Sequence, residues 1–214
     1  MILRRLTISL LLSVSIAPVT QAINLPLADL HEIQLSSPTT LGEKTLGTAL
    51  SLSGSIAAVA ALPDDNLHTG SVYLYDAQQS WGLITELTSQ HETDNFAKHI
   101  ALVGNRLVVS AERDDVHGVD SGAVYIFERS AENIWQQTAQ LTAPDAQTGD
   151  QFGSAIALES DVLYIGAPFH GQGKVYVYTQ DRTTAQWVLQ ETIEPDDPQA
   201  LRFGAAIAQD VQTL

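Results

Sequence analysis

One pattern recurs four times along the chain at nearly constant spacing. Its copies begin at Leu46, Phe96, Phe152 and Phe203, so successive copies start 50, 56 and 51 residues apart. The third copy opens with FGSAIALESDVLYIGAP and the second with FAKHIALVGNRLVVSAE, and the two align without a gap. A repeat of this length is one supersecondary unit, which buries its apolar face only against its neighbours. The repeat therefore limits the possible folds more than any other feature.

Each copy contains four short segments that are typical of β-strands. The first is apolar (AIAL), the second is of the VLYIGA type, and the third alternates strictly after a glycine, as in GAVYIFE from Gly122. The fourth opens at a tryptophan, namely Trp81, Trp135 or Trp187. Alternation of this kind predicts strands, and the Gly, Asp, Asn and Ser between them suit tight turns. The sequence therefore predicts an all-β fold, a β-propeller of four-stranded antiparallel blades.

We expect the first strand to begin at the Phe-Gly position and to lie innermost in its blade. The aromatic ring would then wedge between neighbouring blades, and the glycine would let backbone pass close beside it. We also expect the three tryptophans to pack inside the blades rather than to form a platform for a ligand.

The segments FGSAIALESDVLYIGAP and DSGAVYIF resemble FG-GAP repeats, the blade motif of integrin-alpha-type propellers and of many secreted bacterial proteins. The positions that carry this resemblance are Phe152, Gly153, Gly166, Ala167 and Pro168, with Phe96, Phe203 and Gly204 at the same places in other copies. The second copy departs from the motif, because Ala97 stands where the third copy has glycine. The resemblance implies a ring of seven blades in the full family.

The copies divide the chain into blades at residues 46–95, 96–151 and 152–202, with a partial blade at 203–214. Residues 23–45 precede them, and the stretch 31–40 matches the fourth-strand segment 137–146, so we expect an N-terminal strand that completes a blade. Three complete blades are fewer than the four to eight of known rings, and seven would need roughly 350 residues. We therefore expect a partial sequence; an open array or a ring shared between chains are the alternatives.

Residues 1–22 have the layout of a secretory signal peptide. Arg4 and Arg5 precede an apolar run from Leu6 to Ala17, and small residues follow up to Ala22, where we expect cleavage. The run is too short to span a bilayer comfortably, although a retained membrane anchor stays an alternative. We expect a secreted, periplasmic or cell-surface protein with no membrane span after signal removal. The absence of cysteine excludes disulfides, thiolate zinc sites and a cysteine nucleophile.

The chain is strongly acidic. Its formal net charge is −15, and removal of residues 1–22 takes away two arginines and no acid, which leaves 8 basic against 25 acidic residues and a charge of −17. Such a surface disfavours nucleic acid and anionic lipid, whereas cations remain compatible with it.

Calcium binding of the integrin kind is not expected. The resemblance implies an aspartate-rich calcium loop between the first and second strands, but these connections read only LSGS, VGNR and ESDV. They are the size of a hairpin turn and lack the six to eight oxygen ligands that calcium takes. We therefore expect no cofactor, and the chain is more similar to the calcium-poor FG-GAP repeats of secreted bacterial proteins.

A second group of loops, between the second and third strands, should share one face of the blades. Asp114, Asp115 and Asp120 are candidates there for a divalent cation site. Asp64, Asp65 and His68 occupy similar places in the first copy, and His117 and His170 lie in the second and third. The alternative is that all of these are polar turn residues with solvated side chains.

Catalytic motifs are missing from the sequence. Asp145, Asp150, Asp196 and Asp197 in the connectors between blades are possible acid/base pairs, but no spacing fixes them at a catalytic separation, and turn chemistry explains them better. The predicted first strands carry no acid toward a central channel. We therefore expect a non-enzymatic, adhesion-type module that binds a protein or glycan. A propeller-based hydrolase or lyase, or a structural repeat of a longer surface protein, are the alternatives.

Overall fold

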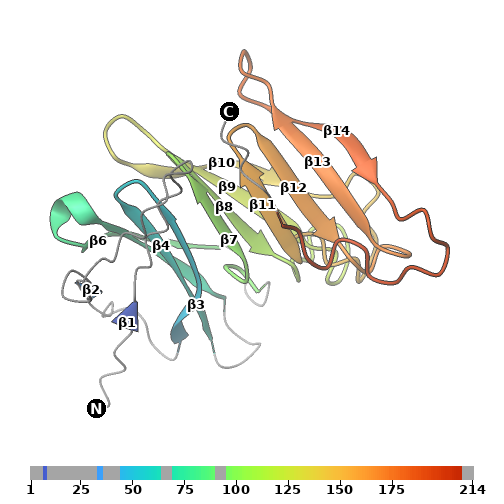
Figure 1. The fold of residues 1–214 in the computed structure, drawn as a ribbon, viewed down its shortest axis with the longest axis horizontal. Helices are drawn as coiled ribbons and strands as arrows, with labels where there is room; N and C mark the ends of the chain where they lie inside the picture. The colour runs from blue at the N-terminus through green and yellow to red at the C-terminus, as the bar shows by residue number, and fades with distance from the viewer. Residues whose placement is uncertain (1–6, 9–32, 36–43, 64–68, 90–94, 209–214) are drawn as a thin grey trace, which may run out of the picture.

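A computed structural model describes residues 7–8, 33–35, 44–63, 69–89 and 95–208. Three four-stranded antiparallel sheets stand side by side in it (Figure 1), and the described part contains almost no helix beyond a 3-10 turn at Ala77–Gln79. The predicted all-β fold of propeller-type blades is confirmed.

The sheets follow the repeat. Blade 1 consists of β3 (Lys44–Ser53), β4 (Ile56–Pro63), β5 (Ser71–Asp76) and β6 (Gly82–Thr88). Blade 2 consists of β7 (Ile100–Val103), β8 (Arg106–Ala111), β9 (Ala123–Arg129) and β10 (Trp135–Leu141). Blade 3 consists of β11 (Ala155–Glu159), β12 (Val162–Ala167), β13 (Lys174–Gln180) and β14 (Trp187–Ile193). A separate two-stranded sheet pairs β1 (Thr7–Ile8) with β2 (Ile33–Gln34).

Strands within each blade pair in sequence order, and the first strands of the three blades are neighbours. The serine hydroxyls of β3 link it to β7, since Ser51 Oγ accepts a hydrogen bond from Leu102 N at 2.9 Å and Ser53 Oγ accepts one from Gly104 N at 2.8 Å. The first strands therefore form the inner side of the array, as expected.

The predicted start of the first strand is wrong in blades 2 and 3. Phe96 and Phe152 lie in turns before β7 and β11, and the residues after them, Ala97 and Gly153, have φ of 74° and 98°. Such left-handed residues interrupt the ladder, and in blades 2 and 3 strand pairing begins only after them. In blade 1 the equivalent Gly47, at a φ of 92°, stands inside β3 where its pairing with β4 shifts in register.

Each Phe-Gly turn closes against the blade that precedes it. A Cβ added to Gly122, just before β9, would lie 2.2 Å from the carbonyl oxygen of Phe152, and one added to Gly173, just before β13, would lie 2.2 Å from that of Phe203. Only glycine leaves room for this approach of backbone to backbone. The glycine before each third strand therefore leaves the space into which the turn that starts the next unit packs.

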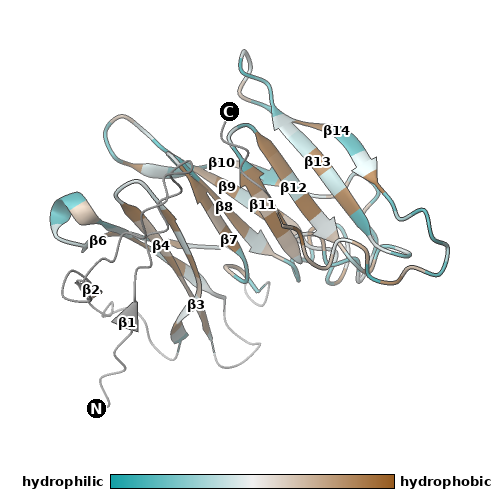
Figure 2. Cartoon of the chain, in the orientation of Figure 1, coloured by the Kyte–Doolittle hydropathy of each residue, from teal (hydrophilic) through white to brown (hydrophobic). Residues whose placement is uncertain are grey.

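The blades stack an aliphatic face on an aromatic face. Between blades 2 and 3, Val108, Val124 and Ile126 meet Leu163, Ile165, Tyr176 and Tyr178, with Phe152 among them. Phe152 meets the two tyrosine rings edge-on, at centroid distances of 5.3 and 6.4 Å, an arrangement that contributes about 0.5–1.5 kcal/mol beyond area burial. Phe96 has the same place against Tyr125 and Phe127. The wedge predicted for the aromatic ring is confirmed, and Figure 2 shows the apolar strand centres that form these contacts.

The tryptophans pack as expected. Trp135 is buried in the core between blades 1 and 2, Trp187 lies under the guanidinium of Arg106, and Trp81 packs against blade 1. Leu35, next to β2, is buried on the outer face of blade 1. Most of residues 1–45 lies outside the described part, so the signal peptide and the blade-completing strand stay predictions.

Candidate functional site

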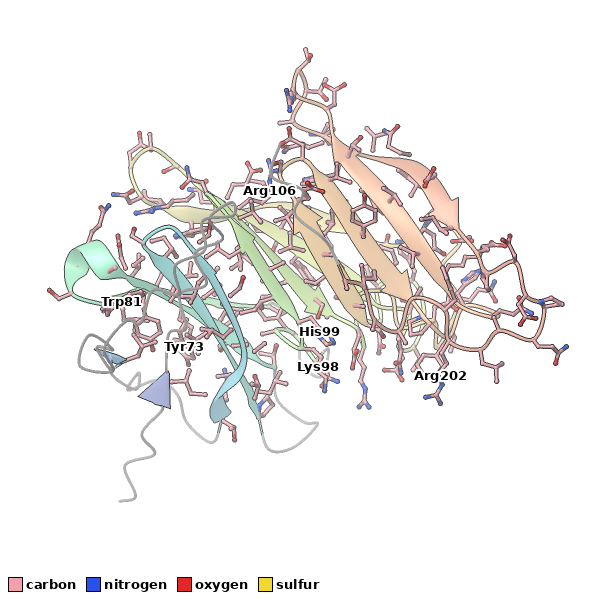
Figure 3. The ribbon with its side chains drawn as sticks, viewed as in Figure 1. Tyr73, Trp81, Lys98, His99, Arg106 and Arg202 are labelled. Carbon is pink, nitrogen blue, oxygen red and sulfur yellow. The ribbon has the colours of Figure 1, made fainter. Side chains whose placement is uncertain are left out.

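The array has two edges with different architecture. The turns that join first to second and third to fourth strands lie on one edge, called here the upper rim (Figure 1). The loops that join second to third strands, and the connectors between blades, lie on the opposite edge, called the lower rim. Figure 3 shows Arg106 on the upper rim and Lys98, His99 and Arg202 on the lower rim.

On the upper rim the turns between first and second strands contain only two residues, as predicted. In place of a calcium loop, the guanidinium of Arg106 joins blades 2 and 3. Its Nε donates to Glu128 Oε1 at 3.0 Å, and its Nη1 donates to the Ser160 carbonyl at 2.6 Å and to Asp161 Oδ1 at 3.3 Å. Its Nη2 donates to the side chain of Gln180. A protein cation therefore sits among these oxygens.

The carboxylate of Asp161 shows how this network is held. Hydrogen bonds from Arg182 and then Arg106 lower its pKa below the usual range for aspartate. An open hollow of about 310 Å³ beside the network is lined by Val103, Asn105, Arg106, Glu128, Arg129, Ser160 and Asp161. Its charged groups are largely occupied with one another, because both acids bind Arg106.

On the lower rim, loop 112–122 of blade 2 is hydrogen-bonded to the connector that leaves the same blade. Gly149 N donates to the Val119 carbonyl at 2.8 Å, and Gln151 N donates to the Asp120 carbonyl at 3.0 Å. In blade 3 the same relation recurs, since Phe203 N donates to the Gln172 carbonyl at 2.9 Å. Each loop is therefore bound to a connector.

A buried histidine joins the two halves of the lower rim. His170, in the loop of blade 3, has Nδ1 2.7 Å from Asp150 Oδ2 and Nε2 3.4 Å from Asp145 Oδ2. Both aspartates belong to the connector from blade 2, and Gln147 N also donates to Asp150 Oδ2, at 2.7 Å. The loops and connectors of blades 2 and 3 therefore form one continuous strip.

Asp145 is bound further by β13. Lys174 Nζ donates to its Oδ2 at 2.9 Å and Tyr176 Oη donates to its Oδ1 at 2.6 Å. Burial opposes ionisation of Asp145, but these hydrogen bonds lower its pKa overall. Burial, and then the hydrogen bond to Asp145, raise the pKa of the Tyr176 hydroxyl. Lys174 also pairs with Glu194 at 2.9 Å, so one lysine ammonium is shared between two carboxylates at this point.

This cluster holds the loop of blade 3 against the connector from blade 2. Each ring nitrogen of His170 faces a carboxylate oxygen of the connector from blade 2, and the ring itself is buried. Asp145 and Asp150, which the sequence suggested as a possible acid/base pair, hold the histidine between them. Their partnership with His170 was missed by the sequence reasoning, because no motif links residues 20 and 25 positions apart.

The structure places the three predicted cation ligands in one loop and gives oxygens of two of them, Asp114 and Asp115, other partners. Asp114 is buried, and its Oδ2 and Oδ1 accept hydrogen bonds from the Tyr125 hydroxyl and from Val116 N. Asp115 Oδ1 accepts one from Asp120 N at 2.8 Å. Among the described residues no group of three or more His, Cys, Asp and Glu is arranged to hold a metal. Cation binding here stays a prediction.

The other candidate residues of these loops have different environments. His117 is exposed on the loop of blade 2, whereas His170 is buried. Asp64, Asp65 and His68 lie outside the described residues. Asp196 and Asp197 are exposed in the connector after blade 3, where Asp197 Oδ1 accepts a hydrogen bond from Gln199 N. They are turn residues, as the sequence favoured.

The lower rim also exposes large apolar side chains, which sequence reasoning did not single out. Their exposed fractions are 49% for Val116, 61% for Val119, 44% for Phe169 and 84% for Leu201. The guanidinium of Arg202 lies 5.1 Å from the centre of the Phe169 ring. The sequence did contain a sign of these exposed side chains, namely apolar residues within otherwise polar loops.

Comparison with known proteins agrees with this architecture. No curated protein matches the chain, and none of the helices in the described residues has the length and hydropathy to cross a membrane. The model of the FG-GAP repeat family matches residues 81–127 and 135–178. Each match begins at the tryptophan before or at a fourth strand and ends within the third strand of the next blade. The chain therefore contains FG-GAP repeats, and its described part forms three propeller-type blades.

Proposed function

We propose that this FG-GAP repeat protein is a non-enzymatic, adhesion-type module that acts outside the cytoplasm and binds a protein or glycan with its lower rim. The observation that carries the proposal is the continuous strip of loops and connectors across blades 2 and 3, which exposes apolar side chains on a fixed backbone. The signal-like residues 1–22 support the location.

The lower rim is better suited to binding than the upper rim. Its loops and connectors are long, and they are fixed by hydrogen bonds and by the Asp150–His170 contact. Binding residues are commonly placed on loops that a rigid scaffold positions. The upper-rim turns between first and second strands have two residues each, so only the turns between third and fourth strands project there, whereas both the loops and the connectors project on the lower rim.

Two observations favour a binding function over a hydrolase or lyase activity. The inner strand β7 carries no acid, and β11 carries only Glu159 at its end. A hydrolase of this fold would need acidic or basic groups that face a substrate. On the lower rim Asp145 instead accepts hydrogen bonds from Lys174 and Tyr176, and Asp150 is buried against His170.

The test is a set of protein and glycan arrays probed with the labelled full chain. We expect hits that disappear in the triple variant Val119→Ser, Phe169→Ser, Leu201→Ser, since these changes remove the exposed apolar groups without touching the core. Ile134→Ser is the matched control, because Ile134 is 53% exposed in the turn between β9 and β10 on the upper rim. Hits lost only in the Ile134 variant, or cleavage of an arrayed glycan by the chain, would refute the proposal.

A further inference from the structure

We propose that the ligand of the lower rim is a polypeptide segment in which lysine or arginine alternates with large apolar side chains. This rests on the proposed function and names its partner class. The inference comes from two properties of the rim that coincide in space, its apolar tips and its excess of carboxylates.

The apolar part of the surface consists of Val116 and Val119 on the loop of blade 2, and Phe169 and Leu201 on the loop and connector of blade 3. Burial of such side chains against a partner is favourable because it removes apolar area from water. Exposed apolar groups gathered on one surface and bordered by polar groups are typical of interaction sites. Here the apolar side chains belong to loops that the hydrogen bonds of the rim join into one strip.

Carboxylates lie close in the sequence to three of the four apolar tips, Val116, Val119 and Leu201. Asp115 and Asp120 flank the two valines in the sequence, and exposed Asp196 and Asp197 lie in the connector that carries Leu201. Over the described rim residues 95–99, 112–122, 142–154, 168–174 and 194–204, nine acids face four lysines and arginines. The acids are Glu112, Asp114, Asp115, Asp120, Asp145, Asp150, Glu194, Asp196 and Asp197, and the bases are Lys98, Arg113, Lys174 and Arg202.

Two of the four bases are already occupied on the rim itself. Lys174 is held between Asp145 and Glu194, and Arg202 lies over Phe169. Because nine acids stand against four bases, the field that an approaching ligand meets is negative, in the same sense as the charge of −15 on the whole chain. Complementary charge selects a cationic partner and speeds its association.

The apolar tips argue against a sugar. Phe169 is the only aromatic residue among the four tips, and the Arg202 guanidinium lies over its ring. The remaining tips are aliphatic and offer no hydrogen-bonding group to hydroxyls. An apolar, cationic polypeptide satisfies both components of this surface at once.

The experiment measures fluorescence anisotropy of a labelled ten-residue peptide of alternating lysine and leucine, titrated with the full chain at low and at physiological salt. Two matched peptides alternate lysine with serine and glutamate with leucine. We expect the lysine–leucine peptide to bind more tightly than either of the others. Affinity should fall about tenfold in Phe169→Ser/Leu201→Ser and about as much in Asp196→Asn/Asp197→Asn.

The controls are changes of the same kind away from the rim. Ile134→Ser on the upper rim and Glu191→Gln on β14 should leave the affinity unchanged, and thermal melts should confirm that all variants fold. Equal binding of the lysine–serine peptide, or equal losses in the controls, would overturn the inference, because binding would then reflect overall charge.

The arrays separate this inference from the proposed function. Glycan hits that depend on the rim, together with no binding of the lysine–leucine peptide, would overturn the partner class and keep the rim as a binding surface. No rim-dependent hit of any class would instead count against the proposed function itself.

Discussion

Blades 2 and 3 are built to one plan, yet each departs from it at a different turn. At the start of the blade, blade 2 has Ala97 at a φ of 74° where blade 3 has Gly153 at 98°. At the turn after the first strand, blade 2 has the glycine, Gly104, at a φ of 58°, and blade 3 has Ser160 at 47°. Each blade thus carries one left-handed residue with a side chain where the other has glycine.

The difference shows which parts of the repeat the packing requires. The aromatic wedge and the glycine before the third strand are present in both blades, because the ring fills the core and the glycine seats the next turn. The turn residues only have to adopt a left-handed conformation, which costs a residue with a side chain about 1–2 kcal/mol. Between blades 2 and 3 the plan therefore varies in its turns and not in its wedges.

Removal of the wedges should produce the largest effects. Phe96→Ala and Phe152→Ala should each lower the free energy of unfolding by about 3–5 kcal/mol, since each empties a fully buried site in the core between two blades. Urea unfolding followed by circular dichroism measures both. A cost below about 1 kcal/mol for either variant would mean that its blade does not depend on the wedge.

Loss of Arg106 should have an intermediate effect confined to the contact between blades 2 and 3. Arg106→Ala leaves the oxygens of Glu128, Asp161 and Gln180 without their shared donor, and we expect a cost of about 1–3 kcal/mol. Hydrogen exchange should show increased opening in blade 3 with blade 1 unchanged. Uniform loss of protection in all three blades would contradict the local role.

Arg182→Ala is the matched control, because Arg182 binds the same Asp161 but its side chain is 87% exposed. Its removal should cost under about 0.5 kcal/mol. Calcium should not bind at the upper-rim turn between blades 2 and 3, since Arg106 takes the cation's place there, so any effect of calcium or of a chelator on the melting temperature of the wild-type chain would come from other loops. A rise with calcium would show that one of those loops holds a metal.

Substitutions at the turn positions where one blade has glycine and the other does not should have smaller effects. Their sign should depend on whether glycine is introduced or removed. Ala97→Gly and Ser160→Gly should each raise the free energy of unfolding by up to about 1 kcal/mol, because glycine relieves the left-handed strain at some cost in chain entropy. Gly153→Ala should lower it, since the new Cβ would also lie 3.1 Å from the Ala123 carbonyl. Equal melting temperatures for all three variants would show that the turns do not store this strain.

Much of the fold could be predicted from the sequence, because strand alternation is a local property. The third strands were placed correctly by their alternating tyrosines, and the short first turns by their length. The start of the first strand was misplaced, since the left-handed conformation of Ala97 leaves no mark in an apolar stretch. The contacts of His170 with Asp145 and Asp150 depend on the stacking of two blades, and the sequence could supply only the candidates.

A small effect at neutral pH and a larger one in alkali are expected where blade 3 has Tyr178 and blade 2 has Phe127. Burial, and then the charge of Asp145, raise the pKa of Tyr178 to about 12, whereas a tyrosine in the unfolded chain titrates near about 10. The folded state therefore binds the proton more tightly, so this contribution to stability is complete below pH 10 and is lost as the pH rises from 10 toward 12.

Tyr178→Phe should remove part of that alkaline loss by making blade 3 resemble blade 2. At pH 7 it should cost about 0.5–1.5 kcal/mol at most, from the lost hydrogen bond to the Thr142 carbonyl. Urea midpoints at pH 7 and at pH 11 measure the difference. Because Tyr75 in blade 1 has its pKa raised to about 12 as well, the variant should retain some alkaline sensitivity. An unchanged difference between the two midpoints would mean that the Tyr178 hydroxyl reaches solvent before the blades unfold.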